Sequence, residues 1–239
     1  CTLKNNTLLN NGTLTVSGGI LNVNGNVNNA NGSTFNQSGG DIIVDGNDAG
    51  VVSNSVASGT NIFGFGTSGT GATLNLTGGK ITIVDPHAAT SSAGGTSNGH
   101  AFAYWGNGYR AGVNHTIQLG DGVSTDAGGH TSGFQYNTWP GTGYFIAGNL
   151  VVNLAAGTNR LVVPPYTVGV EKDLTVTSGE LRLSSSRING NIVNNGTLTS
   201  TGTLELALWG ASLTTSSSVA STNAQTITGS GVFRNSATT

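Results

Sequence analysis

Charge is the scarcest property of this 239-residue chain. Only 8% of its residues are Asp, Glu, Lys or Arg, whereas an ordinary soluble domain carries about 25%. The formal net charge is −2, so the chain has no basic surface to attract nucleic acid or anionic lipid. Its 10 acidic residues are also too few to load an array of calcium sites. These shortages argue against nucleic-acid, lipid-surface and calcium-array functions.

Cysteine and long apolar runs are also scarce. Cys1 is the single cysteine, so the sequence predicts no internal disulfide. No run of 18 or more apolar residues is present, which predicts no membrane span, and no signal peptide is visible. Cys1 is either the lipid-bearing first residue of a lipoprotein or a chance cysteine at a cut point. Both ends read as interrupted strand pattern, so we expect the chain to be an excerpt of a longer one.

The residues that are abundant favour strands. Gly, Asn, Thr and Ser make up about half of the chain, yet 36% of the residues are apolar. Most of these are Val, Ile and Leu at alternating positions, which predicts order because disordered segments lack such residues. Thr, Val and Ile have a high strand propensity, so the composition favours an all-β fold.

An internal repeat is the strongest signal in the sequence. Asn10–Thr15 recurs as Asn194–Thr199. A second unit consists of a short strand, a Gly-Gly pair and another short strand. Its copies are Leu14–Val23, Phe35–Val44, Leu74–Val84 and a weaker fourth at Leu174–Leu183.

The repeat predicts a coil of short strands. Apolar residues at every second position, such as Leu14 and Val16, face inward, while Thr13, Thr15 and Ser17 face outward. The glycines then turn the chain, since glycine reaches positive φ without steric cost. Each strand is expected to pair with its equivalent one turn later, about 4.8 Å away, with Asn side chains stacked in the bends. The predicted fold is a right-handed parallel β-helix, a solenoid that forms a single segment over residues 1–239.

Residues 87–147 depart from this pattern. The segment holds nine of the 15 aromatic residues and all four histidines, His87, His100, His115 and His130. We predict that it is a long, aromatic-rich loop inserted into the coil, because long loops of this kind in repeat proteins are usually functional.

The aromatic segment supplies the candidate binding site. Exposed Trp and Tyr rings stack on sugars and are enriched where proteins bind each other. The alternative interpretation is a small core under the loop, because large rings in ordered loops are mostly buried. The candidate ligand-binding residues are Tyr104, Trp105, Tyr109, Arg110, Tyr136 and Trp139.

Two further constellations are weaker. The four histidines are 13, 15 and 15 residues apart, so turns of that length would stack them into a metal-binding column, although the spacings of known sites are absent. Asp41, Asp45 and Asp48 flank one strand, and Lys80 occupies the position of Asp41 in the next copy, so the two are expected to stack. Such a cluster serves a carbohydrate-active enzyme or is a surface ion pair.

A second acidic pair, Asp121 and Asp126, lies in the aromatic segment, where Gly120-Asp121-Gly122 also reads as a turn. No nucleophile motif accompanies either acidic group. We therefore predict no catalytic residue, no metal and no cofactor.

The repeats resemble those of a group of bacterial proteins. Asn-Gly-Thr-Leu-Thr-Val-Ser-Gly-Gly at 11–19 and Thr-Ile-Thr-Gly-Ser-Gly-Val-Phe at 226–233 are similar to repetitive bacterial surface proteins. These include autotransporter passengers and the long repeat proteins exported by the type IX route. The resemblance covers about three quarters of the chain and omits the aromatic segment. It implies an adhesin, a surface-layer component or a filament part, and some members are carbohydrate-active.

The sequence therefore predicts an extracellular adhesin or structural module, secreted or held at a bacterial cell surface. Its expected partners are surface glycans, other surface proteins, or further copies joined through the ends of the coil. One alternative is a polysaccharide lyase or hydrolase on a β-helix, and another is a cargo of a secretion system.

Overall fold

The computed structural model describes most of the sheet-forming parts of the chain. These are residues 1–4, 8–45, 63–65, 72–84, 101–104, 108–123, 136–137, 145–155, 161–162, 168–183, 186–200, 202–209, 218–219 and 225–235. Every regular element in these ranges is a β-strand, so the predicted all-β class is confirmed. Within the same ranges, no helix has the length and apolar character needed to cross a membrane.

The largest sheet, sheet A, has ten strands in the order β1-β4-β6-β8-β11-β14-β17-β20-β25, with β3 paired to β6. Every strand pair in it is parallel. Its strands are β1 (Thr2–Lys4), β3 (Thr13–Val16), β4 (Ile20–Asn24), β6 (Thr34–Asp45), β8 (Thr73–Ile83), β11 (Asn114–Leu119), β14 (Asn149–Asn153), β17 (Leu174–Ser178), β20 (Ile192–Asn194) and β25 (Ile227–Thr228).

Three smaller parallel sheets accompany it. Sheet B has the order β12 (Tyr136–Asn137), β9 (Phe102–Tyr104), β7 (Phe63–Phe65), β5 (Val27–Asn29), β2 (Leu8–Asn10). Sheet C has the order β10 (Tyr109–Arg110), β13 (Phe145–Ala147), β16 (Val168–Val170), β19 (Ser186–Ile188), β22 (Leu204–Leu206). Sheet D has the order β15 (Leu161–Val162), β18 (Glu180–Leu183), β21 (Thr197–Ser200), β26 (Val232–Asn235). β23 (Leu208–Trp209) and β24 (Ser218–Val219) form an antiparallel pair.

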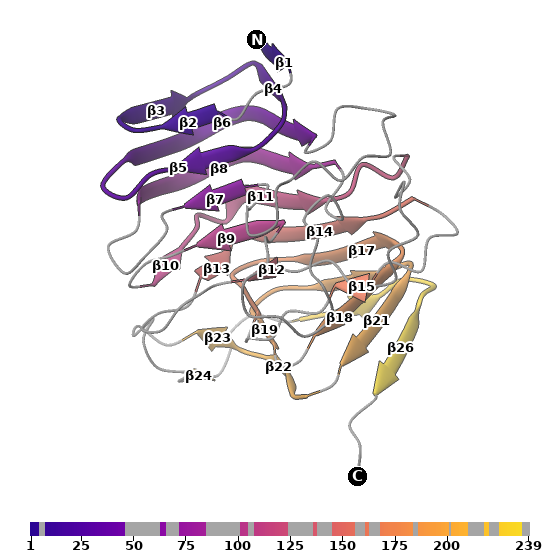
Figure 1. The fold of residues 1–239 in the computed structure, drawn as a ribbon. Coiled ribbons are helices and arrows are strands. Elements are labelled where there is room, and N and C mark those ends of the chain that lie inside the picture. Colours follow the sequence, from indigo (N-terminus) through magenta and orange to yellow (C-terminus); the bar gives the residue numbers. More distant parts are fainter. Residues whose placement is uncertain are drawn as a thin grey trace.

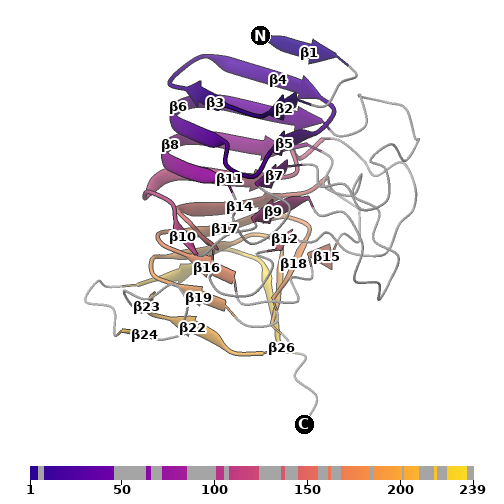
Figure 2. The ribbon, with the colours of Figure 1, turned by 60° about the vertical axis from the view of Figure 1, so that its left-hand side comes forward.

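The chain visits these sheets in a repeating order. From β9 to β14 it goes twice through sheets B, C and A, and from β15 to β20 it goes twice through sheets D, C and A. We call each such circuit a pass. The strands of successive passes lie one below the other, from β1 at one end of the stack to β26 at the other (Figure 1). A view turned by 60° shows the same succession (Figure 2).

Apolar columns run through the stack at right angles to the strands. In sheet A, register partners form the column Ile42, Ile81, Ile117, Leu150, Leu174 and Ile192. Each of these side chains is at most 1% exposed. Alternate positions such as Thr73, Asn75 and Thr77 are exposed. The period of two read from the sequence therefore separates the core from the surface.

The first three copies of the Gly-Gly unit stack as the sequence predicts. Leu14 pairs with Phe35 and Phe35 with Leu74, and beyond the glycines Leu21 pairs with Ile42 and Ile42 with Ile81. The second glycine of each pair has a positive φ, as at Gly79, where φ is 86°. A Cβ on Gly79 would lie 2.6 Å from the carbonyl oxygen of Gly40 one pass earlier. Only glycine fits there, because the backbones of successive passes are in contact.

The fourth copy of the unit stacks differently. Leu174 pairs with Leu150 and so continues the column of Ile81, which follows Gly-Gly in the earlier copies. The residues after Gly179 leave sheet A and form β18 in sheet D. The fourth copy is therefore not equivalent in register to the first three, because its glycine turns the chain from one sheet to another.

The described parts of segment 87–147 contain paired strands, so the prediction of one long inserted loop needs correction there. β9, β10, β11 and β13 lie within it, and all of them pair in parallel with strands of neighbouring passes. The strand repeat therefore continues there, although the intervals between strands are long. β12 also lies within the segment and pairs in parallel with β9, and the segment outside 101–104, 108–123, 136–137 and 145–147 lies outside the described residues.

Polar side chains stack along the axis, as predicted for the bends. Asn10 Nδ2 donates to Asn29 Oδ1 at 3.0 Å. Immediately before the sheet A strands, Asn191 donates its backbone N–H and its Nδ2 to Asp173 Oδ1, at 2.9 and 3.2 Å. Thr226 N–H donates in turn to Asn191 Oδ1 at 3.0 Å. We call Asn149, Asp173, Asn191 and Thr226 the axial ladder, because Asp173 N–H also donates to Asn149 Oδ1 at 3.4 Å.

Candidate functional site

Three aromatic residues of segment 87–147, Phe102, Tyr104 and Phe145, belong to the core. Tyr104 on β9 is 6% exposed, and its ring centroid is 5.7 Å from that of Phe145. Phe102 packs at 4.9 Å from Phe145 and 6.1 Å from Phe63. These rings fill the space between sheets B and C. For Tyr104 the core interpretation is confirmed, and its ring is not available to stack on a sugar.

Tyr109 on β10 is half-buried beside the same rings. Its centroid is 6.3 Å from that of Tyr104 and 5.9 Å from that of Phe145. The backbone N–H of Leu76 donates to its hydroxyl oxygen at 2.5 Å. Burial raises the pKa of Tyr109, and the hydrogen bond from Leu76 opposes that rise. Tyr109 therefore anchors β10 to the preceding pass.

The remaining candidate aromatic residues are only partly placed. Tyr136 lies on β12, where it is the register partner of Phe102. Trp105 and Trp139 lie outside the described residues. Their part in ligand binding stays a prediction.

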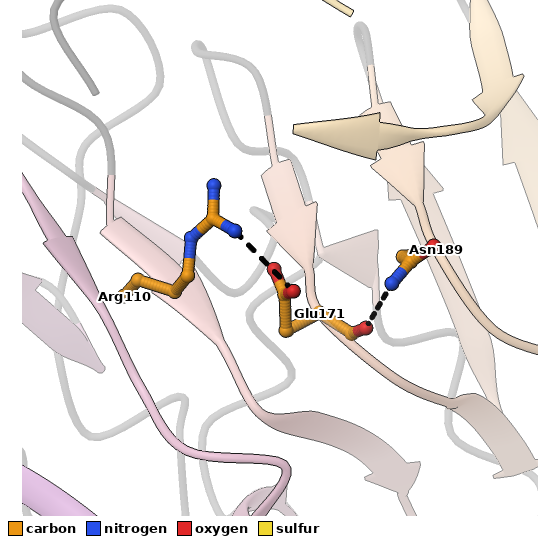
Figure 3. A network of polar contacts seen from close by, with 3 residues as sticks. All are labelled: Arg110, Glu171 and Asn189. Atoms are coloured by element: carbon orange, nitrogen blue, oxygen red, sulfur yellow. Dashed lines mark hydrogen bonds and ion pairs between the residues drawn. The ribbon is translucent and has the colours of Figure 1, made fainter. Parts of the chain in front are cut away.

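Arg110, the charged member of the candidate set, takes part in a polar network (Figure 3). Its Nη1 lies 3.4 Å from Oε1 of Glu171, which follows β16. Asn189, which follows β19, donates from Nδ2 to the carbonyl oxygen of Glu171 at 3.0 Å. β13 lies between β10 and β16, and the register of Ala147 with Val170 continues to Gly148 beside Glu171, so the intervening pass has no side chain there. The network therefore links passes that are not adjacent.

Glu171 is the least satisfied group of this network. Its side chain is 14% exposed against 33% for Arg110, and its Oε2 is buried without a hydrogen-bond partner. Burial raises the pKa of Glu171, and the charge of Arg110 opposes this rise. Because Oε2 is shielded from solvent, the partly exposed guanidinium of Arg110 is the member of the network that can contact a hydroxyl-bearing ligand.

A second ion pair lies on the same sheet. Arg187 on β19 and Glu205 on β22 are register partners, and Arg187 Nε donates to Glu205 Oε2 at 2.7 Å. The Arg187 side chain is 7% exposed and that of Glu205 is 39% exposed. Arg110 and Arg187 fall in one register column of sheet C, separated by Ile146 and Gly169. In a chain so poor in charge, sheet C gathers two of its Arg–Glu pairs.

The prediction that the four histidines stack into one metal-binding column is wrong. In this part of the stack the register partners Ile81 and Ile117 are 36 residues apart, and Ile117 and Leu150 are 33 apart, rather than 13 to 15. The register partner of His115 on β8 is Gly79. Among the described residues, no group of three or more His, Cys, Asp or Glu side chains could hold a metal ion. His87, His100 and His130 lie outside the described residues.

His115 is instead a core residue. It is fully buried and its Nε2 lies 3.1 Å from Oε1 of Gln37, which is also fully buried. Its Nδ1 is buried without a partner. Burial lowers the pKa of His115 to about 4, so the ring is neutral at neutral pH.

The acidic candidates are placed in part. Asp41 and Lys80 are register partners, as predicted from their positions after Gly-Gly. Asp45 ends β6, while Asp48 and Asp126 lie outside the described residues. Asp121 accepts a hydrogen bond from Val123 N–H at 2.8 Å, which supports the turn interpretation.

Sequence reasoning missed Glu171, Asn189 and Gln37. Their partners are 61, 18 and 78 residues away in the chain. A local sequence pattern cannot predict contacts between residues so far apart in the chain, because the number of residues in a pass varies along the stack. The one available signal was rarity, since Glu171 is one of only 10 acidic residues.

Comparison with models of protein families, with curated proteins and with solved structures gives no significant match.

Proposed function

We propose that this chain is a segment of right-handed parallel β-helix that serves as an extracellular structural or adhesive module, secreted or held at a bacterial surface. The repeated visits to the same sheets, with parallel pairing between passes, support the β-helix. Right-handedness is supported by the general rule that crossovers between parallel strands are right-handed in about 98% of cases.

One observation carries the structural role: through the described residues, the apolar columns continue from pass to pass. Each pass buries its apolar side against its neighbours, so a long rigid body forms from short strands. The exposed positions are mainly Thr, Asn and Ser, which give a polar surface with little charge. Such a body presents binding residues at a fixed distance from its point of attachment.

The adhesive role rests on Arg110 of sheet C and on three aromatic residues of the candidate set. The guanidinium of Arg110, whose side chain is 33% exposed, offers hydrogen-bond donors for hydroxyl groups. Trp105, Tyr136 and Trp139, from the candidate set, add rings that can stack on a sugar. Surface glycans are therefore the proposed partners, with other surface proteins as a further class.

The ends of the stack support association between copies. Three core columns end in Leu206, Ile227 and Phe233, which are 37%, 50% and 48% exposed. The residues one pass earlier, Ile188, Ile192 and Leu198, are at most 2% exposed. Sheet A ends in β25 on this side and in β1 on the other, so a second copy can continue the same parallel sheet.

Binding to a glycan array tests the adhesive part. The chain is applied beside Arg110→Ala, Trp105→Ala and Trp139→Ala variants, with Thr77→Ala as a control at an exposed strand position. We expect binding of the chain and of the control, and at least a tenfold loss in each of the three variants, as expected for hot-spot residues. Equal binding by all variants, or none by the chain, contradicts the adhesive role. Release of reducing ends from the arrayed polysaccharides would point to an enzyme instead.

A further inference from the structure

The Gln37–His115 pair spans three strands inside the core. Gln37 lies on β6 and His115 on β11, and β8 runs between these strands. The side chain of Gln37 passes β8 at Gly79, where an added Cβ would lie 2.8 Å from Gln37 Nε2. The missing side chain of Gly79 therefore makes the contact possible.

The hydrogen bonds define the protonation of the pair. Gln37 Nε2 donates to the carbonyl oxygens of Gly40 and Lys80, at 3.2 and 3.1 Å. Its Oε1 is left as an acceptor, so His115 Nε2 carries the hydrogen atom. The second ring nitrogen, Nδ1, is then an unprotonated acceptor that is buried without a partner.

The pair lies at a joint in the stack. β6 and β8 each run through the Gly-Gly bend as one long strand, whereas the next pass divides into β10 and β11. His115 belongs to the turn that opens β11, since its N–H donates to Gly112 O at 2.9 Å and Gly112 N–H donates to Leu76 O at 2.8 Å. A weakening of the packing around His115 therefore acts on the contact between the pass that contains β8 and the pass that contains β10 and β11.

No carboxylate on the described neighbouring strands faces His115. Asp41 on β6 and Lys80 on β8 share a register column with Thr116, whose side chain points to the opposite face from that of His115. β10 carries Tyr109, which stays neutral because burial raises its pKa, and Arg110, which is paired with Glu171. β14, on the other side of β11, has no titratable residue.

We propose that the buried Gln37–His115 pair makes this joint acid-sensitive, so that protonation of His115 opens the stack between β8 and β11. A proton added at Nδ1 creates a charge in an apolar core and an N–H without an acceptor. The opened form solvates the imidazolium and removes both penalties.

The direction of the pH effect follows from the difference in the pKa of His115 between the closed and the open form. His115 has a pKa of about 4 when closed and about 6.5 when exposed, so the open form binds the proton more tightly between these values. Stability at the joint is full above pH 6.5 and is lost as the pH falls toward 4. The opening equilibrium constant is expected to rise by up to about tenfold for each pH unit in this window.

Hydrogen exchange of the whole chain tests the proposal. Protection factors of the β8 and β11 amides are measured at pH 7 and pH 4.5, corrected for the intrinsic exchange rate. We expect them to fall by about 100-fold over this range, while those of β17 and β20 change less than tenfold. An equal change in all four strands would overturn the proposal.

A variant and a titration complete the test. His115→Gln keeps a donor toward Gln37 but does not titrate, so its β8 and β11 amides should lose most of their pH dependence, whereas His100→Gln should keep it. Should His115→Gln fail to fold, the imidazole carbon resonances of the unaltered chain decide. Absence of titration above pH 5 supports the proposal, and titration of His115 near pH 6.5 overturns it.

Discussion

At the residue scale, the glycines of the Gly-Gly bends are the most constrained positions of the structure. Gly79 has a φ of 86°, and a Cβ there would lie 2.6 Å from Gly40 O and 2.8 Å from Gln37 Nε2. We expect Gly79→Ala to lower the free energy of unfolding by at least about 2 kcal/mol, because left-handed strain costs about 1–2 kcal/mol before any clash. Denaturant unfolding followed by circular dichroism measures this change.

Gly12→Ala is the matched control. No atom lies within 4 Å of an added Cβ at Gly12. The free energy of unfolding should therefore change by less than about 0.5 kcal/mol. Equal effects of the two substitutions would show that the passes are not packed backbone against backbone at Gly79.

Residue-level prediction from the sequence succeeds where the cause is local. Alternation places Val16 and Val23 inside and Thr13 and Thr15 outside, because the period of a strand is a local property. It fails for Gln37, whose partner lies on the strand beyond the neighbouring one. The candidate set likewise mixed Tyr104, a core ring, with Arg110, a partly exposed cation, because segment composition does not distinguish the two faces of a strand.

At the scale of the element, the axial ladder holds the starts of β14, β17, β20 and β25 in place. Asp173 Oδ1 accepts two hydrogen bonds from Asn191. We expect Asp173→Ala to destabilise the chain by about 1–3 kcal/mol, because a part-buried N–H loses its acceptor. Asp173→Asn keeps the acceptor oxygen and should cost about 0.5 kcal/mol. Chemical unfolding measures both, and equal losses would mean that the charge, rather than the ladder, matters.

Strand register offers a direct chemical test. Asn36 and Asn75 are register partners on β6 and β8, and neighbouring strands are about 4.8 Å apart, within the Cα separation that a disulfide bridges. In a Cys1→Ser background, Asn36→Cys with Asn75→Cys should oxidise to an internal disulfide. Mass spectrometry after digestion detects it.

The control for that test shifts one cysteine along the strand. Asn36→Cys with Thr77→Cys places the thiols two residues out of register, about 8 Å apart, which is beyond disulfide reach. Equal oxidation of both pairs would contradict the parallel register. This register was predictable for the first three Gly-Gly copies because the unit repeats without insertion. It was not predictable for Leu174–Leu183, where Gly179 turns the chain from sheet A into sheet D.

At the scale of the whole molecule, the proposed association between copies depends on the exposed ends of the core columns. Replacing both Ile227 and Phe233 by Asp places charges on the exposed end of the core columns. We expect the unaltered chain to form head-to-tail oligomers whose average size grows with concentration, and the double variant to remain monomeric. Sedimentation velocity over a concentration series measures both. Val123→Asp, at a site that is 78% exposed, should associate like the unaltered chain.

The long intervals between strands explain why the segment 87–147 read as a loop. Its strands are two to six residues long, and their pairing with β7, β8 and β14 is visible only in three dimensions. The aromatic rings that suggested a binding loop are, where described, the filling of the core at that level.

The stacking direction also decides how the molecule bears a load. Because β1 and β26 lie at opposite ends, a pull on these two strands acts along the backbone hydrogen bonds between passes, which then carry the force in series. Under tension, passes detach one after another from an end instead of shearing together. The pass from Leu174 to Ile192 releases 18 residues, or about 60 Å of extended chain. Under tension the stack therefore lengthens in steps and absorbs work at each one.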